Sequence, residues 1–216
     1  MRTTILVIRH GETEWNKNGI FQGQLDSPLS SVGLKQAKAV AAALEEDQVN
    51  FIYSSDLGRA MSTAKIIADP HNIEVIPDPQ LRERHLGVFQ GVDKKRIDEK
   101  YPEELERYNS GDPDHIILKG ESSRQRYQRS ISRFLQLAEE HAGGCLIMVT
   151  HGGVLRGILE MVLELPQNGL RHFSLLNASI ARFSNVRGHW MMDSWGETCH
   201  LKGLEKRDDW KSNSRI

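Results

Sequence analysis

The tripeptide Arg9-His10-Gly11 holds the side chains with the clearest chemical use, and it directly follows the apolar run 5–8. A guanidinium suits phosphate oxygens, and an imidazole, partly neutral near pH 7, can act as a nucleophile. The branched apolar run predicts a strand buried on both faces of a parallel sheet. Because open α/β sheets bind ligands at the carboxyl ends of their strands, Arg9 and His10 are expected at a ligand site. Gly11 allows a sharp turn there and a close approach of the ligand.

The same pattern recurs later in the chain, where the apolar run 145–149 leads into Thr150-His151-Gly152-Gly153. If the two strands are parallel neighbours, His10 and His151 face each other across one pocket. A single histidine in a folded protein is usually a hydrogen-bonded structural residue. Two histidines at matching strand ends, one of them beside an arginine, are poorly explained in that way.

A further candidate is Arg59, which falls in the first turn of a helix predicted to open at Asp56. A cation at a helix N-terminus works against the helix dipole, which favours negative charge at that end. The position makes sense if an anion binds there. On residue type alone, a solvated surface arginine is an equal alternative.

Residues 15–28 contain several glycine, asparagine and aspartate residues and are predicted to form a loop over the end of the first strand. Within this loop, Asn16 and Gln22 carry amides that can donate to phosphate oxygens, although residue type alone favours ordinary loop polarity. Glu83 lies between two arginines. By composition alone, that position suggests a salt-bridged structural carboxylate.

These elements predict an α/β fold: a three-layer sandwich with a mostly parallel central sheet, helices on both faces and an antiparallel edge. Strands are expected at 5–8, 51–54, 73–76, 145–149, 179–183 and 189–192, and helices with apolar faces within 34–44, 60–68, 127–138 and 155–162. The charge-rich segment 92–120 is expected to be a short cap insertion over the site. Residues 1–216 are expected to form a single domain.

The composition, 38% hydrophobic and 26% charged with a net charge of −1, is that of an ordinary soluble globular protein. It argues against a nucleic-acid partner, which usually requires a basic excess. No apolar run is long enough to span a bilayer, and none resembles a signal-peptide core, so we expect no membrane partner and a cytoplasmic location. Two distant cysteines form no disulfide framework, and the histidine spacing indicates no metal site.

The longer pattern Arg9-His10-Gly11-Glu12-Thr13-x-Trp15-Asn16 resembles the signature of the histidine phosphatase superfamily, which includes cofactor-dependent phosphoglycerate mutases and many small phosphatases. The resemblance continues in the expected order over most of the chain. It is carried by Phe21-Gln22-Gly23, Ser54-Ser55-Asp56-Leu57-Gly58-Arg59-Ala60, Leu81-Arg82-Glu83 and Thr150-His151-Gly152-Gly153.

The resemblance implies a metal-independent phosphomonoester hydrolase that has no cofactor and acts on a small phosphorylated metabolite. It implies that His10 becomes phosphorylated and that Glu83 protonates the leaving group, with Arg9, Arg59 and His151 completing the catalytic set. The phosphate-binding residues that it implies are Arg9, Gly11, Asn16, Gln22, Gly23, Arg59, His151 and Gly152. The oligomeric state stays open, with a homodimer as one alternative.

Two other functions are considered. A phosphoglycerate mutase would return the phosphoryl group to a bound sugar acid, but mutases carry a longer cap with paired arginines and an Asn-Ser after the second His-Gly. In this sequence the cap is short and lacks the arginine pair, and the motif continues as Gly153-Val154. A non-catalytic phosphate-binding regulatory module is the other alternative. The presence of the nucleophile, both arginines, the second histidine and the acid disfavours it.

Overall fold

A six-stranded mixed sheet forms the centre of the protein, and the computed structural model describes residues 1–167, 173 and 175–204. The strand order is β3-β2-β4-β1-β5-β6. β1 to β4 run parallel, whereas β5 is antiparallel to β1 and β6 to β5. The strands are β1 Arg2–Arg9, β2 Phe51–Ser54, β3 Val75–Pro77, β4 Cys145–Thr150, β5 Ile180–Val186 and β6 His189–Glu197.

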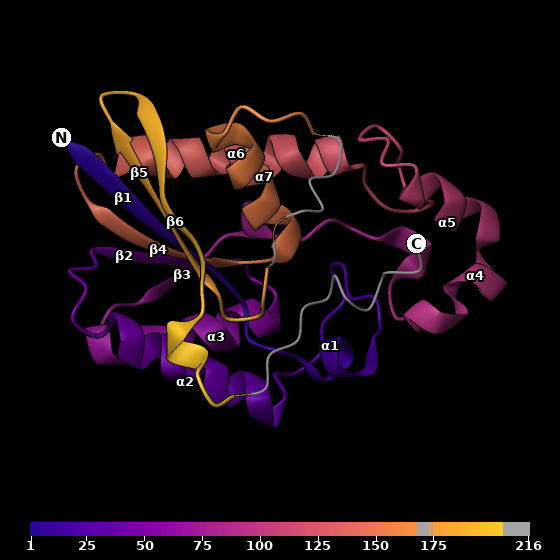
Figure 1. The fold of residues 1–216 in the computed structure, drawn as a ribbon, viewed down its shortest axis with the longest axis horizontal. Helices are drawn as coiled ribbons and strands as arrows, with labels where there is room; N and C mark the ends of the chain where they lie inside the picture. Colours follow the sequence, from indigo (N-terminus) through magenta and orange to yellow (C-terminus); the bar gives the residue numbers. More distant parts are fainter. Residues whose placement is uncertain (168–172, 174, 205–216) are drawn as a thin grey trace.

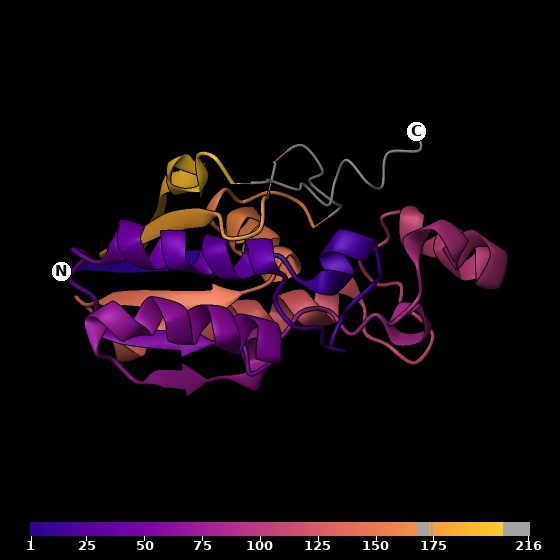
Figure 2. The same ribbon diagram turned by 90° about the horizontal axis from the view of Figure 1, so that it is seen from below.

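Two pairs of helices cover the sheet, α2 (Ser31–Leu44) with α3 (Gly58–Ala68) on one face and α6 (Ser123–Glu140) with α7 (Gly152–Val162) on the other (Figures 1 and 2). Successive residues of a strand point to opposite faces. Accordingly, Ile5 and Val7 of β1 pack with the α6–α7 layer, and Leu6 and Ile8 pack with the α2–α3 layer. The predicted three-layer α/β fold with an antiparallel edge is confirmed.

The register of β1 and β4 places the two His-Gly motifs beside each other. The strands are parallel neighbours, and Arg9 pairs with Thr150 at their carboxyl ends. His10 and His151 are therefore the next residue on each strand, as the repeated sequence pattern predicts. Both lie in the middle of the sheet, where helices from both layers surround them.

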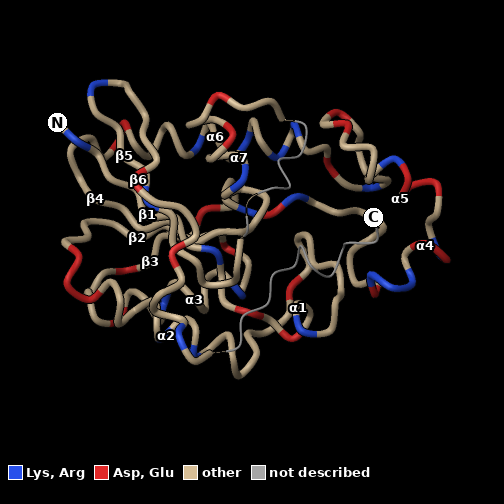
Figure 3. The backbone as a smooth tube through the Cα atoms, in the orientation of Figure 1, with Lys and Arg blue, Asp and Glu red and all other residues tan. Residues whose placement is uncertain are grey.

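The predicted cap lies beyond the carboxyl ends of the parallel strands, at the right of Figure 1. It contains α4 (Ile97–Lys100) and α5 (Pro102–Asn109), and its apolar side chains gather around Phe89, Ile97 and Ile117 in a cluster separate from the two sheet-face clusters. Lys and Arg alternate with Asp and Glu along the chain of this part (Figure 3). The boundaries 92–120 and the single-domain reading of 1–216 stay predictions.

The local differences from the predicted elements have identifiable causes. The predicted loop 15–28 begins with a short helix, α1 (Glu14–Asn18), because Thr13 and Asn16 form a capping box. The edge strands extend further than their apolar alternation indicated. Short 3₁₀ segments occur at Asp69–His71, Pro79–Leu81, Gly87–Phe89, Lys94–Arg96 and Cys199–Leu201. In the described part of the chain, no helix has the length and apolar character needed to cross a membrane.

Candidate active site

A cavity of about 530 Å³ lies between the carboxyl ends of the parallel strands and the segment 94–115. Its wall consists of residues from the sheet edge, the α1 loop, the first turn of α3, the helices α6 and α7 and the cap. The predicted site residues on its wall are Arg9, His10, Asn16, Gln22, Gly23, Arg59, Glu83 and Gly152.

A backbone carbonyl group fixes the orientation of the buried His10 ring. Its Nδ1 lies 2.8 Å from the carbonyl oxygen of Gly11, and because that oxygen can only accept, Nδ1 carries the proton. Burial, followed by the charges of Arg59 and Arg9, lowers the pKa of His10 well below 6.5. The imidazole is therefore neutral near pH 7, with the lone pair on Nε2.

Arg59 is the cation that faces this lone pair. Its Nε donates to His10 Nε2 over 3.3 Å, and the rest of the guanidinium donates to the carbonyl oxygens of Gly23 and Leu25 and to the Asp26 carboxylate. The side chain is 2% exposed. The prediction that Arg59 falls in the first turn of a helix is confirmed, and its guanidinium reaches the nucleophile.

Arg9 and His151 lie on the other sides of His10. Arg9 donates through Nη1 to the carbonyl oxygen of Leu175 and is almost fully buried. The rings of His10 and His151 meet edge-on with centroids 5.1 Å apart. His151 Nε2 bonds to the Ser55 hydroxyl over 2.8 Å, whereas its buried Nδ1 has no hydrogen-bond partner in the described structure.

Burial also sets the charge of His151. Burial and the nearby Arg59 lower the pKa of His151 well below 6.5. The pair of histidines is therefore uncharged in the absence of an anion, and the positive charge of the site comes from the two arginines. Bound phosphate would change this balance, because a nearby anion favours the protonated imidazole.

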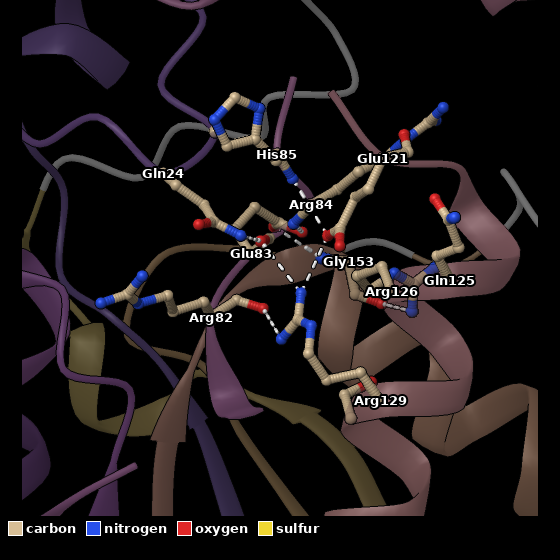
Figure 4. A network of polar contacts seen from close by, with 12 residues as sticks. Gln24, Arg82, Glu83, Arg84, His85, Glu121, Gln125, Arg126, Arg129 and Gly153 are labelled. Atoms are coloured by element: carbon tan, nitrogen blue, oxygen red, sulfur yellow. Dashed lines mark hydrogen bonds and ion pairs between the residues drawn. The ribbon is translucent and has the colours of Figure 1, made fainter. Parts of the chain in front are cut away.

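Glu83 reaches the site from the segment after β3, and backbone amides fix its carboxylate (Figure 4). Oε1 accepts from the amide of Arg84 over 2.8 Å, and Oε2 accepts from the amide of Gly153 over 2.9 Å. Arg129 on α6 holds the segment itself by donating to the carbonyl oxygens of Gln80, Arg82 and Glu83. The carboxylate of Glu83, the acid predicted from sequence, thus lies against the first turn of α7, directly after the second His-Gly.

The predicted phosphate-binding residues divide into two groups. Asn16, Gln22, Gly23 and Gly152 line the cavity. Gly11 does not, because its amide donates to the Thr63 hydroxyl and its carbonyl accepts from His10. Gly11 therefore orients the nucleophile, and its phosphate contact stays a prediction. His151 lies beside His10 and is likewise not part of the cavity wall.

The sequence profile of the Histidine phosphatase superfamily (branch 1) matches residues 5–198, which include every residue of this site. The chain belongs to the histidine phosphatase superfamily. This membership confirms the resemblance read from the motifs.

Individual relatives include both phosphatases and mutases. A metal-independent phosphoserine phosphatase from Arabidopsis thaliana is 42% identical over 205 residues, covering 94% of this chain and 84% of that protein. A probable phosphoglycerate mutase, GpmB, from Yersinia pestis is 36% identical over 205 residues, covering 91% of this chain and 94% of that protein. The structure of Bacillus stearothermophilus YhfR superposes with a TM-score of 0.88 at 28% identity, covering 93% and 100% of the two chains. The comparisons indicate an enzyme of phosphatase or mutase type.

This histidine phosphatase site also contains residues that sequence reasoning did not single out. Ser55 orients His151, Leu175 holds Arg9 through its carbonyl group, and Arg126 lines the cavity and donates to the carbonyl oxygen of Gly153. Ser55 and Leu175 carry no distinctive sequence signal. Arg126 does carry one, because it precedes Ser130, Phe134 and Leu137 on the buried stripe of α6, where a cation is unusual.

The described residues also bear on metal binding. Among them, no group of three or more His, Cys, Asp or Glu side chains is arranged to hold a metal ion. His172, one of the histidines to which no ligand role was assigned, lies outside the described residues. His85, which follows Glu83 closely in sequence, accepts the Gly87 amide through Nδ1 and is not part of the cavity wall.

Proposed function

We propose that this protein hydrolyses a small phosphomonoester without a metal ion, through a phosphohistidine at His10. The observation that carries the proposal is the placement of His10 on the cavity wall beside two buried arginines, with Nδ1 bonded to the Gly11 carbonyl group and Nε2 bonded to Arg59. A phosphate monoester carries close to two negative charges near neutral pH. Arg9 and Arg59 supply the neutralisation that metal ions supply in other phosphoryl-transfer enzymes.

In the first step, His10 Nε2 attacks phosphorus in line with the ester oxygen. The N–P bond forms as the P–O bond to the leaving group breaks, and the Glu83 carboxyl group gives its proton to the departing oxygen. Proton loss from Glu83 leaves a carboxylate held by the amides of Arg84 and Gly153. The unpartnered Nδ1 of buried His151 is available to a phosphoryl oxygen that reaches His10.

In the second step, water attacks the phosphohistidine. The Glu83 carboxylate takes a proton from the water, the N–P bond breaks, and inorganic phosphate leaves with neutral His10 restored. The same carboxyl group therefore acts first as acid and then as base, which returns the site to its starting state.

Mutase activity is the second candidate, because relatives are named as mutases. The short cap without an arginine pair and the Gly153-Val154 that follows the second His-Gly favour hydrolysis instead. A non-catalytic regulatory role is the third candidate, and the intact set of predicted catalytic residues disfavours it. O-phosphoserine is the first substrate to test, since the relative from Arabidopsis thaliana is named for it.

The test is phosphate release from an aryl phosphate and from O-phosphoserine in the presence of a chelator, with wild type and His10→Ala compared. Isomerisation of 3-phosphoglycerate is measured in parallel. Release that survives the chelator and is lost in His10→Ala supports the phosphatase. Isomerisation with little release supports the mutase, and phosphate binding without turnover supports the regulatory alternative.

A further inference from the structure

One face of α7 carries Gly153, Gly157 and Glu160 at the i, i+4, i+7 spacing of a single helix face. The two glycines make room for side chains from other elements. A Cβ atom at Gly153 would lie 2.2 Å from Glu83 Oε1, and one at Gly157 would lie 2.6 Å from Arg126 Nη1. Moving along this face from the catalytic centre, the acid comes first, Arg126 next and Glu160 last.

Arg126 is a buried cation on the cavity wall. It is 8% exposed, and in the described structure its only hydrogen bond is from Nη1 to the carbonyl oxygen of Gly153 over 2.5 Å, with no carboxylate at ion-pair distance. Burial lowers the pKa of Arg126, with Glu83 and Glu160 opposing that effect. A buried charge is costly unless it is paired. Its position in the cavity therefore favours an anionic group of a ligand.

Glu160 is the opposite charge on the same wall. It is 6% exposed, lines the cavity, and forms no ion pair within the described part of the chain. Burial raises the pKa of Glu160, and Arg126 and Arg156 oppose this shift. Helical side chains lean toward the helix N-terminus, so this carboxylate leans back toward Arg126 and the catalytic centre.

We propose that Arg126 and Glu160 form a second subsite, which binds the zwitterionic end of a phosphorylated amino acid. Arg126 binds the α-carboxylate and Glu160 binds the α-ammonium group. The inference rests on the proposed phosphatase function and adds the residues that would choose the substrate. A phosphate ester of an uncharged alcohol has no group that pairs with Arg126 or Glu160. A phosphorylated hydroxy acid has a carboxylate for Arg126 but no ammonium group for Glu160.

The spacing suits a short substrate. Glu83 is bonded to the amide of Gly153, and Arg126 is bonded to the carbonyl oxygen of the same residue. The leaving oxygen of the substrate and its α-carboxylate would therefore lie close together, on either side of Gly153. At about 1.5 Å of rise per residue, Glu160 lies about 10 Å along α7 from Gly153, a gap that its backward-leaning side chain shortens.

Other cations on this wall do not replace Arg126. The guanidinium of Arg84 donates to the Glu121 and His115 carbonyl oxygens and to the Ser123 hydroxyl, so its donors are used in holding the cap. Lys94, Lys95 and Arg156 also line the cavity and favour anions in general. Besides Glu83, the other carboxylates on the wall, Asp98 and Asp112, are exposed, so we assign discrimination in favour of an ammonium group to the buried Glu160.

The experiment measures kcat/KM for four esters: O-phosphoserine, 3-phosphoglycerate without the amine, O-phosphoethanolamine without the carboxylate, and glycerol phosphate without either. Removing one charge-assisted contact is expected to change a specificity ratio about tenfold or more. Glu160→Gln lowers the ratio of O-phosphoserine to 3-phosphoglycerate. Arg126→Gln lowers the ratio of O-phosphoserine to O-phosphoethanolamine. Circular dichroism and thermal melting check that both variants fold.

Matched controls are Arg2→Gln and Asp193→Asn, which each remove one charge from an ion pair at the start of β1, far from the cavity. Both ratios stay at the wild-type value in these controls. The subsite proposal is overturned if both ratios also stay unchanged in Glu160→Gln and Arg126→Gln. It is overturned as well if the wild type prefers glycerol phosphate.

Binding of O-phosphoserine to the His10→Ala protein, measured by titration calorimetry, separates the two proposals. If the wild type hydrolyses no ester, the phosphatase proposal fails, and this binding measurement still decides the subsite. Weaker binding after Glu160→Gln or Arg126→Gln is added to His10→Ala supports it. Unchanged binding rejects it.

Discussion

At the scale of single residues, nucleophilic attack by His10 depends on which of its ring nitrogens carries the proton. The Gly11 carbonyl fixes the proton on Nδ1, so Nε2 presents its lone pair to the cavity. Arg59, Arg9 and burial keep the ring neutral by lowering the pKa of His10. Glu83 has the complementary task, since an alkoxide is a poor leaving group and needs a proton as the P–O bond breaks.

The role of Glu83 predicts a dependence on the leaving group. Glu83→Gln is expected to lower kcat for an alkyl phosphate by about 10²–10⁴-fold, the usual range for general acid catalysis. The loss should be far smaller for an aryl phosphate with an acidic phenol, because that leaving group departs without a proton. Rates are compared over a series of esters. An equal loss for all of them would mean that Glu83 acts only in binding or folding.

At the scale of elements, α7 positions both the acid and the proposed specificity residue Arg126 through two of its glycines. Gly153 and Gly157 lie one turn apart, and each is in contact with a different functional side chain, Glu83 or Arg126. The helix itself would be more stable with alanine at either position, by roughly 1 kcal/mol. The glycines are thus better explained by the space they leave than by the helix they form.

This arrangement predicts different effects for two similar substitutions. Gly153→Ala displaces the Glu83 carboxylate and should lower kcat about tenfold or more, with the same leaving-group dependence as Glu83→Gln. Gly157→Ala moves the Arg126 guanidinium instead and should change the ratio between esters with and without a carboxylate. Steady-state kinetics on the same ester series measures both effects. Identical profiles for the two variants would contradict the assignment.

Much of this site could be predicted from local sequence, and the remainder depends on tertiary packing. Each strand end with its His-Gly motif is encoded within a few residues, so the placement of His10 and His151 follows once the strands pair. The role of Gly11 in orienting His10 could not be predicted locally, because its amide is held by Thr63 on α3, which is distant in sequence. Arg126 reaches Gly153 only through the packing of α6 on α7, which its own sequence neighbourhood does not encode.

At the scale of the whole molecule, a chain of net charge −1 builds a strongly cationic cavity by burying arginines at the junction of sheet and cap. The two histidines between them are held neutral, with their pKa values lowered first by burial and then by Arg59. Unfolding releases both rings into water, where they titrate near their ordinary pKa of 6.5. The unfolded chain therefore binds protons that the folded chain does not.

This linkage predicts how stability depends on pH. A group whose pKa is lowered by folding stabilises the folded state fully above its unfolded pKa, and that stabilisation is lost as the pH falls. The free energy of unfolding should thus fall below about pH 6.5. The measurement is urea unfolding in a phosphate-free buffer at several pH values. The double variant His10→Gln with His151→Gln should show a smaller slope in this range than wild type, and His189→Gln on the exposed edge strand serves as the control. An unchanged slope in the double variant would contradict the prediction.

The most direct test of the central claim is to trap the phosphoenzyme. Wild type is mixed with a labelled aryl phosphate in the presence of a chelator, quenched rapidly in alkali, digested and analysed by mass spectrometry. We predict one base-stable, acid-labile phosphoryl group on the peptide that contains His10, formed at least as fast as turnover and absent in His10→Ala. Label on another residue, or phosphate release that continues in His10→Ala, would contradict it.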